Sequence, residues 1–114
     1  MTQKSQALGR DGEQQAADWY VANGYHVLDR NWRYREGELD LVLRKNRTIV
    51  FCEVKTRTTA AFGTPAEAIT HQKRQKLRHL AAKWLDESPV RPRQIRFDVA
   101  AILAGELEIL EGAF

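Results

Sequence analysis

The stretch Gly37–Arg57, GELDLVLRKNRTIVFCEVKTR, decides the fold of this chain. Two apolar runs rich in β-branched residues flank a polar tetrapeptide that contains Asn46. This pattern is typical of two antiparallel strands joined by a tight turn, and it predicts a β-hairpin. Strand positions in such a hairpin are rarely charged unless the charges are paired or bind something. The charged residues of this stretch are therefore the feature to explain.

Side chains alternate between the two faces of a strand, so the hairpin assigns each residue to a face. In the first strand one face is expected to hold Glu38, Asp40 and Val42, and the other Leu39, Leu41 and Leu43. In the second strand one face is expected to hold Phe51, Glu53, Lys55 and Arg57, and the other Val50, Cys52 and Val54. Two carboxylates and a lysine are thus held on strands.

The composition is that of an ordinary globular chain. With 114 residues, 43% hydrophobic and 29% charged, it predicts a single domain over residues 1–114 with one modest core. No apolar run reaches the length of a membrane span and no signal peptide opens the sequence, so a cytoplasmic location is expected. Cys52 is the only cysteine, which excludes an intrachain disulfide and a thiolate zinc site. Its thiol is expected to face the core.

The remaining elements follow from periodicity and from helix-end signals. Residues 8–23 predict a helix that ends at Gly24, a residue suited to the left-handed position after a helix. Residues 25–33 predict a strand before the hairpin. A second helix is expected to begin at a capping box over Thr64–Glu67 or at Thr70 and to run to about Asp86. Strands are expected over 94–103 and 106–110, the last at a sheet edge. The order αβββαββ predicts an α/β domain with helices on a mixed sheet.

Glu13 lies on the apolar stripe that Ala16, Ala17 and Tyr20 form on the first helix. Gly9 and Gly12 beside it are poor helix formers and suggest close approach by backbone or ligand. Glu13 is therefore either aimed at a site in the protein or a glutamate that complements the positive end of the helix dipole. Both readings fit the sequence.

Basic residues gather in three clusters. They are Arg30, Arg33 and Arg35; Lys73, Arg74, Lys76 and Arg78; and Arg91, Arg93 and Arg96. The net charge of +3 and the isoelectric point of 9.2 are only mildly basic. Solvated charged faces are common, but basic clusters beside strand carboxylates favour a nucleic-acid partner. Asp98 is expected to pair with a nearby arginine.

Asp40 and the tripeptide Glu53-Val54-Lys55 suggest a specific chemistry. If the hairpin pairs as expected, the two carboxylates converge at one end of adjacent strands and repel each other unless a cation joins them. Oxygen ligands of this kind suit Mg²⁺ or Mn²⁺, which can polarise a phosphodiester and activate water. Lys55 is placed to orient that water or to stabilise developing charge. A structural network of ion pairs is the alternative reading of the same residues.

Several motifs together resemble a known family. They are Gly9-Arg10-x-Gly12-Glu13, Asn31-Trp32-Arg33, Gly37–Leu41, Phe51–Arg57, and Phe62-Gly63 followed by a basic helix carrying Lys73. The chain is similar over nearly its whole length to the YraN-like family of uncharacterised bacterial proteins. That family is similar to the archaeal Holliday-junction resolvases and to the PD-(D/E)xK nuclease superfamily. The resemblance implies a restriction-endonuclease-like fold.

The resemblance also implies roles for individual residues. Asp40 and Glu53 would be metal ligands, with the backbone carbonyl of Val54 as a third, and Lys55 would be the catalytic lysine. Glu13 would match the helical glutamate of the resolvases, as a supporting ligand or base. Leu39-Asp40 stands where the superfamily has Pro-Asp, which leaves the aspartate in place. The residues expected to contact nucleic acid are Arg33, Arg35, Arg57, Gln72, Lys73 and Arg74.

Three hypotheses follow. The first is a Mg²⁺- or Mn²⁺-dependent DNA endonuclease that acts on branched DNA such as four-way junctions. It would have no membrane partner, and it would form a homodimer if it follows the resolvases. The second is a non-catalytic nucleic-acid-binding module on a nuclease fold. The third is an interaction protein in which the charges form a structural network.

Overall fold

The computed structural model describes residues 2–35, 37–59 and 69–114. Its elements are α1 (Thr2–Ala22), β1 (His26–Tyr34), β2 (Gly37–Lys45), β3 (Thr48–Arg57), α2 (His71–Glu87), β4 (Gln94–Leu103) and β5 (Glu106–Leu110). The expected order αβββαββ and the hairpin are therefore confirmed. Within these residues, no helix has the length and apolar character needed to cross a membrane.

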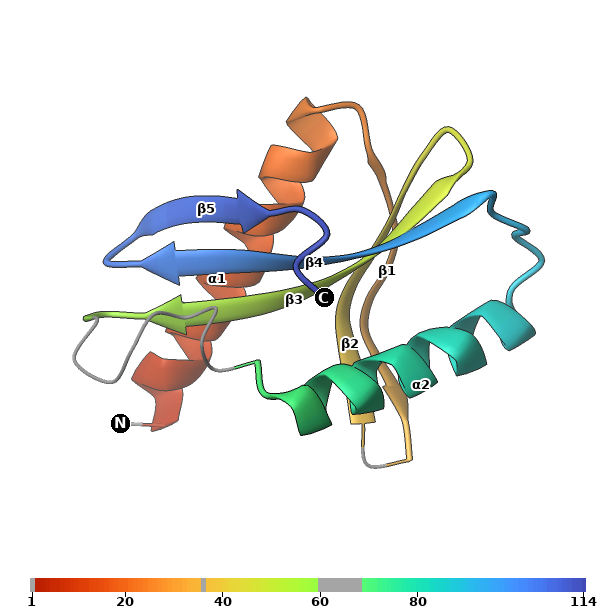
Figure 1. The fold of residues 1–114 in the computed structure, drawn as a ribbon. Coiled ribbons are helices and arrows are strands. Elements are labelled where there is room, and N and C mark those ends of the chain that lie inside the picture. Colours follow the sequence, from red (N-terminus) through yellow and green to blue (C-terminus); the bar gives the residue numbers. More distant parts are fainter. Residues whose placement is uncertain (1, 36, 60–68) are drawn as a thin grey trace.

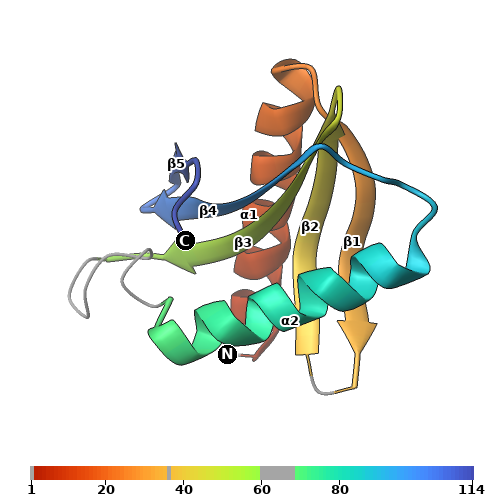
Figure 2. The same cartoon turned by 45° about the vertical axis from the view of Figure 1, so that its right-hand side comes forward.

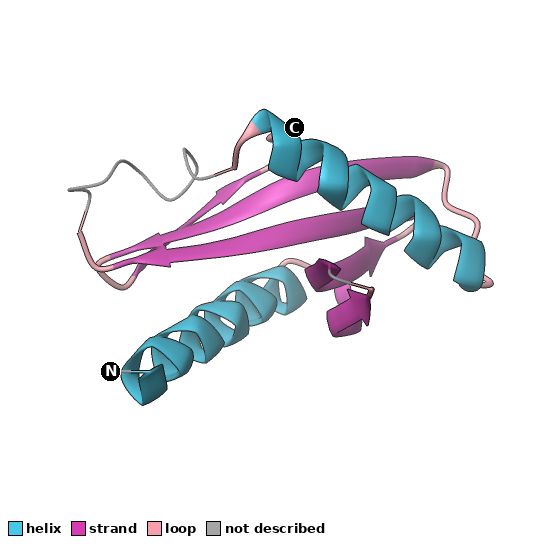
Figure 3. Ribbon diagram, turned by 90° about the horizontal axis from the view of Figure 1, so that it is seen from below, coloured by secondary structure: helices cyan, strands magenta, loops and turns pink. Residues whose placement is uncertain are grey.

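The strands form one mixed sheet in the order β1-β2-β3-β4-β5. Only β3 and β4 pair in parallel, and α2 makes the crossover between them, while the other neighbours are antiparallel. The two helices cover opposite faces of the sheet (Figure 1 and, seen edge-on, Figure 3). This mixed α/β arrangement is consistent with a restriction-endonuclease-like fold, as the sequence predicts. The last strand, β5, lies at the sheet edge, as expected.

Local sequence signals fix the C-terminal end of α1 and the N-terminal end of α2. Gly24 has φ 89°, and the amides of Gly24 and Tyr25 donate to the carbonyls of Val21 and Tyr20. This pair of bonds is the Schellman motif, which requires a left-handed residue after the helix. At α2 the Thr70 Oγ1 atom accepts a hydrogen bond from the Lys73 amide at 3.2 Å, so Thr70 is the N-cap. The predicted capping box at Thr64–Glu67 and the pair Phe62-Gly63 lie outside the described residues.

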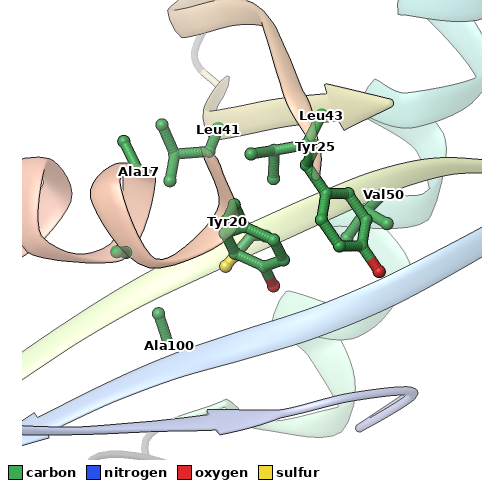
Figure 4. Packing of buried hydrophobic residues seen from close by; sticks show 9 residues of the cluster. Ala17, Tyr20, Tyr25, Leu41, Leu43, Val50 and Ala100 are labelled. Atoms are coloured by element: carbon green, nitrogen blue, oxygen red, sulfur yellow. The ribbon is translucent and has the colours of Figure 1, made fainter. Parts of the chain in front are cut away.

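The core on the α1 side joins the helix to three strands. Tyr20 and Tyr25 pack edge to face with ring centroids 5.1 Å apart. Around them lie buried side chains from α1, β2, β3 and β4 (Figure 4): Ala16, Ala17, Leu41, Leu43, Val50, Cys52 and Ala100. The predicted apolar stripe of α1 is thus confirmed. Cys52 is 3% exposed, so its thiol faces the core as predicted, and burial raises its pKa.

The core on the α2 side is built around aromatic rings. Trp84 packs edge to face on Phe51, and its indole N–H donates to Asp29 at 3.1 Å. Apolar residues of β2, β3 and α2 complete this cluster: Leu39, Val42, Ile49, Leu77, Leu80 and Ala81. Burying apolar side chains of this size contributes roughly 1.5–3 kcal/mol each. Both faces of the sheet are therefore covered in its middle.

Leu39 corrects one sequence prediction. It was expected to share a face with Leu41 and Leu43, but it packs with Val42 on the α2 side, whereas Leu41 and Leu43 pack on the α1 side. Alternation assumes a continuous pleat. Here the β2–β3 ladder ends at the pair Leu41–Cys52, and Asn31, between the β1 residues paired to Leu41 and Leu39, has φ 50°. The pleat therefore breaks at Asp40.

Asp98 is completely buried and anchors the end of α1. Its carboxylate forms two hydrogen bonds with Arg96, at 2.8 and 2.9 Å, and accepts one from the Tyr20 hydroxyl at 2.6 Å. A fourth comes from the amide of Gly112 at 3.0 Å. The predicted pairing with an arginine is thus confirmed. Because Arg96 turns inward and pairs with Asp98, this member of the third basic cluster stabilises the core.

Candidate active site

The site lies where β2 and β3 diverge. Beyond Leu41 and Cys52 the strands no longer pair (Figure 2). There the side chain of Asp40, instead of the backbone of β2, forms a hydrogen bond with the backbone of β3. Its Oδ2 atom accepts a hydrogen bond from the amide of Val54 at 2.8 Å. A carboxylate thus takes the place of a strand partner, which fixes Asp40 in the opening between the two strands.

Three carboxylates from two elements gather at this opening. One carboxylate oxygen each from Glu13, Glu38 and Asp40 lies within 4.8 Å of the other two, and all three residues are half-buried. Glu13 comes from α1, whereas the others come from the start of β2. Of the two readings of Glu13 that the sequence leaves open, its position beside Glu38 and Asp40 agrees with the one in which it is aimed at a site in the protein.

Gly12 lets α1 come close enough to the sheet to bring Glu13 there. A Cβ atom at this position would overlap Thr56 Oγ1 and lie 3.0 Å from Ile102 Cδ1. Of the two readings of this glycine, close approach of the backbone to neighbouring strands is thus confirmed. A glycine in a helix costs roughly 0.5–1 kcal/mol relative to alanine, so packing has overridden helix propensity here.

Glu53 lies on the α2 face of β3 and is linked both to Asp40 and to Lys55. Its carboxyl group is close enough to Asp40 for each to influence the pKa of the other, and its Oε1 atom lies 3.3 Å from the Lys55 ammonium. The side chains of Glu53 and Lys55 are 14% and 20% exposed. The structure therefore brings together Asp40, Glu53 and Lys55, as the sequence predicts, at the edge of the Glu13–Glu38–Asp40 cluster.

Burial and mutual repulsion act on these acids. Burial, and after it the neighbouring Glu53, raise the pKa of Asp40, against the lowering effect of the Val54 amide. Burial also raises the pKa of Glu53, and Lys55 opposes that change. Raised carboxyl pKa values in a partly enclosed site are typical of functional acids, although structural networks can produce them too. Asp40 and Glu53 are therefore easier to protonate than ordinary carboxyl groups.

A groove opens beside the acids, between α2 and the start of β2. It has a volume of about 160 Å³. Its lining consists of Gly37, Glu38, Glu53, Lys73, Lys76, Leu77 and Leu80. The groove therefore has two carboxylates of the sheet, Glu38 and Glu53, on one side and two lysines of α2, Lys73 and Lys76, on the other.

Comparison with known proteins places the chain in a family. The model of uncharacterised protein family UPF0102 matches residues 12–102. A UPF0102 protein of Frankia alni is 50% identical over 113 residues, which cover 95% of this chain and 94% of the relative. One from Beutenbergia cavernae is 49% identical, with 93% and 94% covered, and one from Nocardia farcinica 52% identical, with 86% and 77% covered.

The chain belongs to the UPF0102 family. This membership confirms the resemblance to the YraN-like proteins. The UPF0102 match spans Glu13, Asp40, Glu53, Lys55 and Lys73, so the whole site lies within the family region.

The other predicted contact residues of this UPF0102 protein divide into two groups. Arg57 lies at the end of β3 near Lys55 and Lys73, and Gln72 and Lys73 are exposed in the first turn of α2. Arg33 and Arg35 lie at the β1–β2 end, where Arg33 faces Glu38 at 3.6 Å.

Arg35 and Arg74 lie against aromatic rings instead of in the groove. The guanidinium of Arg35 is 5.3 Å from the centroid of the Tyr34 ring, and that of Arg74 is 5.9 Å from the Phe114 ring. Neither is among the residues that line the groove.

Sequence reasoning gave too little weight to one residue of the UPF0102 site. Glu38 was considered only as an additional ligand, yet it joins Glu13 and Asp40 in the carboxylate cluster. The available signal was its position two residues before Asp40 on the same expected face. The carbonyl of Val54 stays a predicted ligand, because the hydrogen bond that Val54 forms with Asp40 is through its amide.

Proposed function

We propose that this protein is a metal-dependent phosphodiesterase that acts as a DNA endonuclease. The observation that carries the proposal is the half-buried group of carboxylates, Glu13, Glu38 and Asp40, with Glu53 and Lys55 at its edge. Carboxylates that repel one another beside a lysine supply the ligands and the cation that phosphodiester hydrolysis requires.

The donor set fits Mg²⁺ or Mn²⁺. Both ions prefer oxygen ligands in an octahedral shell with several waters retained. One carboxylate oxygen from each of Glu13, Glu38 and Asp40 lies within 4.8 Å of the other two, so three oxygen donors are available in one place. Asp40, Glu13 and Glu38 would hold the ion, and Glu53 would be the adjoining ligand. Such an ion would polarise the phosphodiester and make water a better nucleophile.

The chain's own residues would supply the rest of the chemistry. Lys55, on the same strand face as Glu53, would orient the attacking water and stabilise charge on the phosphorane. The bond from the Val54 amide holds Asp40 in place, so its geometry does not depend on the substrate. Glu13, as a base or supporting ligand, would accept a proton from the water.

Cleavage of labelled DNA tests the proposal. A four-way junction, a linear duplex and a single strand would each be incubated with wild type in Mg²⁺ and in Mn²⁺. Glu53→Gln and Lys55→Ala are expected to abolish metal-dependent cutting while keeping the fold. Glu108→Gln, which removes an exposed glutamate on the distant edge strand β5, is the matched control and should cut as wild type does.

The outcomes separate the rival functions. Binding of DNA without cutting would favour the non-catalytic module, because the basic α2 side could hold a backbone by itself. Equal cutting by wild type and Lys55→Ala would contradict the roles proposed here. The mass of the protein in solution, measured with and without junction DNA, would show whether the homodimer expected by analogy with the resolvases forms.

A further inference from the structure

The start of β2, residues 37–40, carries two of the three clustered carboxylates and loses its pairing with β3. On the β3 side, Asp40 joins it to the Val54 amide by a hydrogen bond of 2.8 Å. On the other side it pairs with β1, as far as the pair Gly37–Tyr34. A two-stranded part of a sheet needs packing from another layer to be stable. The position of these four residues therefore depends on what covers them.

Helix α2 covers this end of β1 and β2 (Figure 2). Gly37 lies against Leu80, and Leu39 belongs to the same apolar cluster as Leu80. One turn further along the helix, the Lys83 ammonium is 5.1 Å from the centroid of the Tyr34 ring, and Tyr34 is the β1 partner of Gly37. Helix α2 thus contacts both strands at the point where the paired ladder ends.

Alternate residues of the segment have different contacts. Gly37 and Leu39 pack on α2. Glu38 and Asp40, which follow each of them, bring their carboxylates to within 4.8 Å of that of Glu13 on α1. Because the four residues are consecutive on one strand, a shift of the first pair on α2 must displace the second pair.

The contact at Gly37 leaves no room for a side chain. A Cβ atom there would lie 2.7 and 2.8 Å from the two methyl carbons of Leu80 and 3.1 Å from its Cγ atom. Leu80 is only 4% exposed and is enclosed in the apolar cluster, where a side chain cannot move without displacing its neighbours. An added methyl would therefore push the backbone apart, and the start of β2 is the side without a second strand to hold it.

We propose that Gly37 and Leu80 are positioning residues of the carboxylate site. The bare backbone of Gly37 seats the start of β2 on Leu80, and this contact sets where Glu38 and Asp40 stand relative to Glu13. The inference rests on the proposed function, to which it adds two residues that govern metal affinity without touching the metal. Substituting groups that orient metal ligands typically weakens metal binding by roughly 10–100-fold.

The position of the segment can be tested without metal. Hydrogen exchange of ¹⁵N-labelled protein in EDTA would be followed at two amides of β3: that of Val54, which donates to Asp40, and that of Val50, which lies where β3 is paired on both sides. Gly37→Ala should speed exchange at Val54 relative to Val50. An unchanged ratio would overturn the proposal.

A core variant at the other end of β2 is the matched control. Leu43→Ala truncates a fully buried leucine that packs on the α1 side. It should lower the overall stability without speeding exchange at Val54 relative to Val50, because it leaves the contact between Gly37 and Leu80 in place.

Binding of Mn²⁺, followed by the electron paramagnetic resonance signal of the free ion, supplies the second measurement. Gly37→Ala should bind Mn²⁺ roughly tenfold more weakly than wild type, whereas Leu43→Ala should bind it as wild type does. Adding Leu80→Ala to Gly37→Ala should restore much of the affinity, because it removes all three atoms that the new methyl would meet.

This recovery separates positioning from a general loss of stability. The double variant has the smaller core, so an effect of stability alone predicts weaker binding than in Gly37→Ala, and that result would overturn the proposal. Leu80→Val, a smaller truncation of the same side chain, takes the place of Leu80→Ala if the double alanine variant does not fold.

The two proposals fail in different ways. If Gly37→Ala keeps the exchange ratio and the Mn²⁺ affinity of a wild type that cuts DNA, the positioning role is wrong and the proposed function stands. If Gly37→Ala speeds exchange at Val54 but the wild type neither binds Mn²⁺ nor cuts DNA, the proposed function is wrong.

Discussion

Asp98 and Asp40 are both aspartates set into strands under the same helix, and their surroundings are opposite. Asp98 accepts hydrogen bonds from Arg96, Tyr20 and Gly112, so its charge is fully compensated inside the core. Asp40 accepts a hydrogen bond from the Val54 amide and faces the carboxylates of Glu13, Glu38 and Glu53. The charge of Asp98 is thus compensated by hydrogen-bond donors, whereas Asp40 lies among groups that repel its charge. Burial alone therefore does not distinguish a structural acid from a functional one, but its partners do.

Replacing Asp98 should have the largest effect on stability. Asp98→Asn removes the buried charge partner of Arg96 and leaves its guanidinium with the exposed Glu111, 3.7 Å away, and removing one member of a buried pair costs about 3 kcal/mol of unfolding free energy. This loss is at the low end of the range for buried ion pairs because the side chain of Arg96 is 20% exposed. Urea unfolding followed by circular dichroism measures it. Asp18→Asn, at an exposed position of α1, is the control, and a loss below 1 kcal/mol in Asp98→Asn would remove the contrast with Asp40.

Gly12→Ala should disturb the contacts that helix α1 makes with the two aspartates. Helix α1 carries Tyr20 to Asp98 near its C-terminal end and Glu13 to Asp40 near its middle. An added methyl would overlap Thr56 Oγ1 and lie 3.0 Å from Ile102 Cδ1, and overpacking of this kind costs about 2 kcal/mol even though alanine favours a helix. Unfolding measurements should show this loss, with Mn²⁺ binding weakened through the displacement of Glu13. A variant more stable than wild type would mean that α1 does not need this close contact.

Replacing Asp40 should raise the free energy of unfolding, whereas replacing Asp98 should lower it. Without divalent metal at pH 8, Asp40→Asn should raise the unfolding free energy by about 1 kcal/mol, within the range seen when strained functional residues are replaced. The amide keeps an acceptor for the Val54 N–H but no longer repels Glu53 and Glu13. The same urea experiment measures it, with Mg²⁺ expected to stabilise wild type and not the variant. Destabilisation like that of Asp98→Asn would favour the structural-network reading.

The pH dependence of stability should sharpen the comparison further. Burial and Glu53 raise the pKa of Asp40 to about 8, whereas an unfolded aspartate has a pKa of about 3.9. The folded state therefore binds more protons than the unfolded state between these values. The contribution to stability is complete below about pH 4 and is lost as the pH rises through 8. Urea midpoints in EDTA should show the advantage of Asp40→Asn over wild type growing from pH 5 to pH 8.5, and a constant difference would contradict the raised pKa.

Most of the fold could be predicted from local signals in the sequence. Gly24 identified the end of α1 because a left-handed residue is needed there, and the turn residues Ala104-Gly105 separated two strands whose bounds agree with the prediction. These features depend on a few neighbouring residues, so the sequence contains them directly. The site residues Asp40, Glu53 and Lys55 were also found in this way, from spacing on a hairpin.

Features that depend on distant partners were not predictable in the same way. Leu39 was assigned to the wrong face because the pleat breaks where β2 leaves β3, which no local pattern announces. The meeting of Lys73 and Glu53 in one groove needs the crossover between β3 and β4, and the bonds to Asp98 from Tyr20 and Gly112 join three separate segments. Periodicity gives the face of a residue only while a strand stays regular.

The register of β3 bears on which metal the proposed site would select. Ten consecutive residues of β3 pair in parallel with β4, and this ladder turns Cys52 into the core and Glu53 outward beside the carboxylates. A slip of one residue would exchange the two faces and place a sulfur ligand among the oxygens. Thiolates favour zinc and copper(I) over magnesium. In the proposed metal site, the long pairing with β4 would thus disfavour soft metals by keeping the Cys52 thiol in the core, away from the oxygen donors.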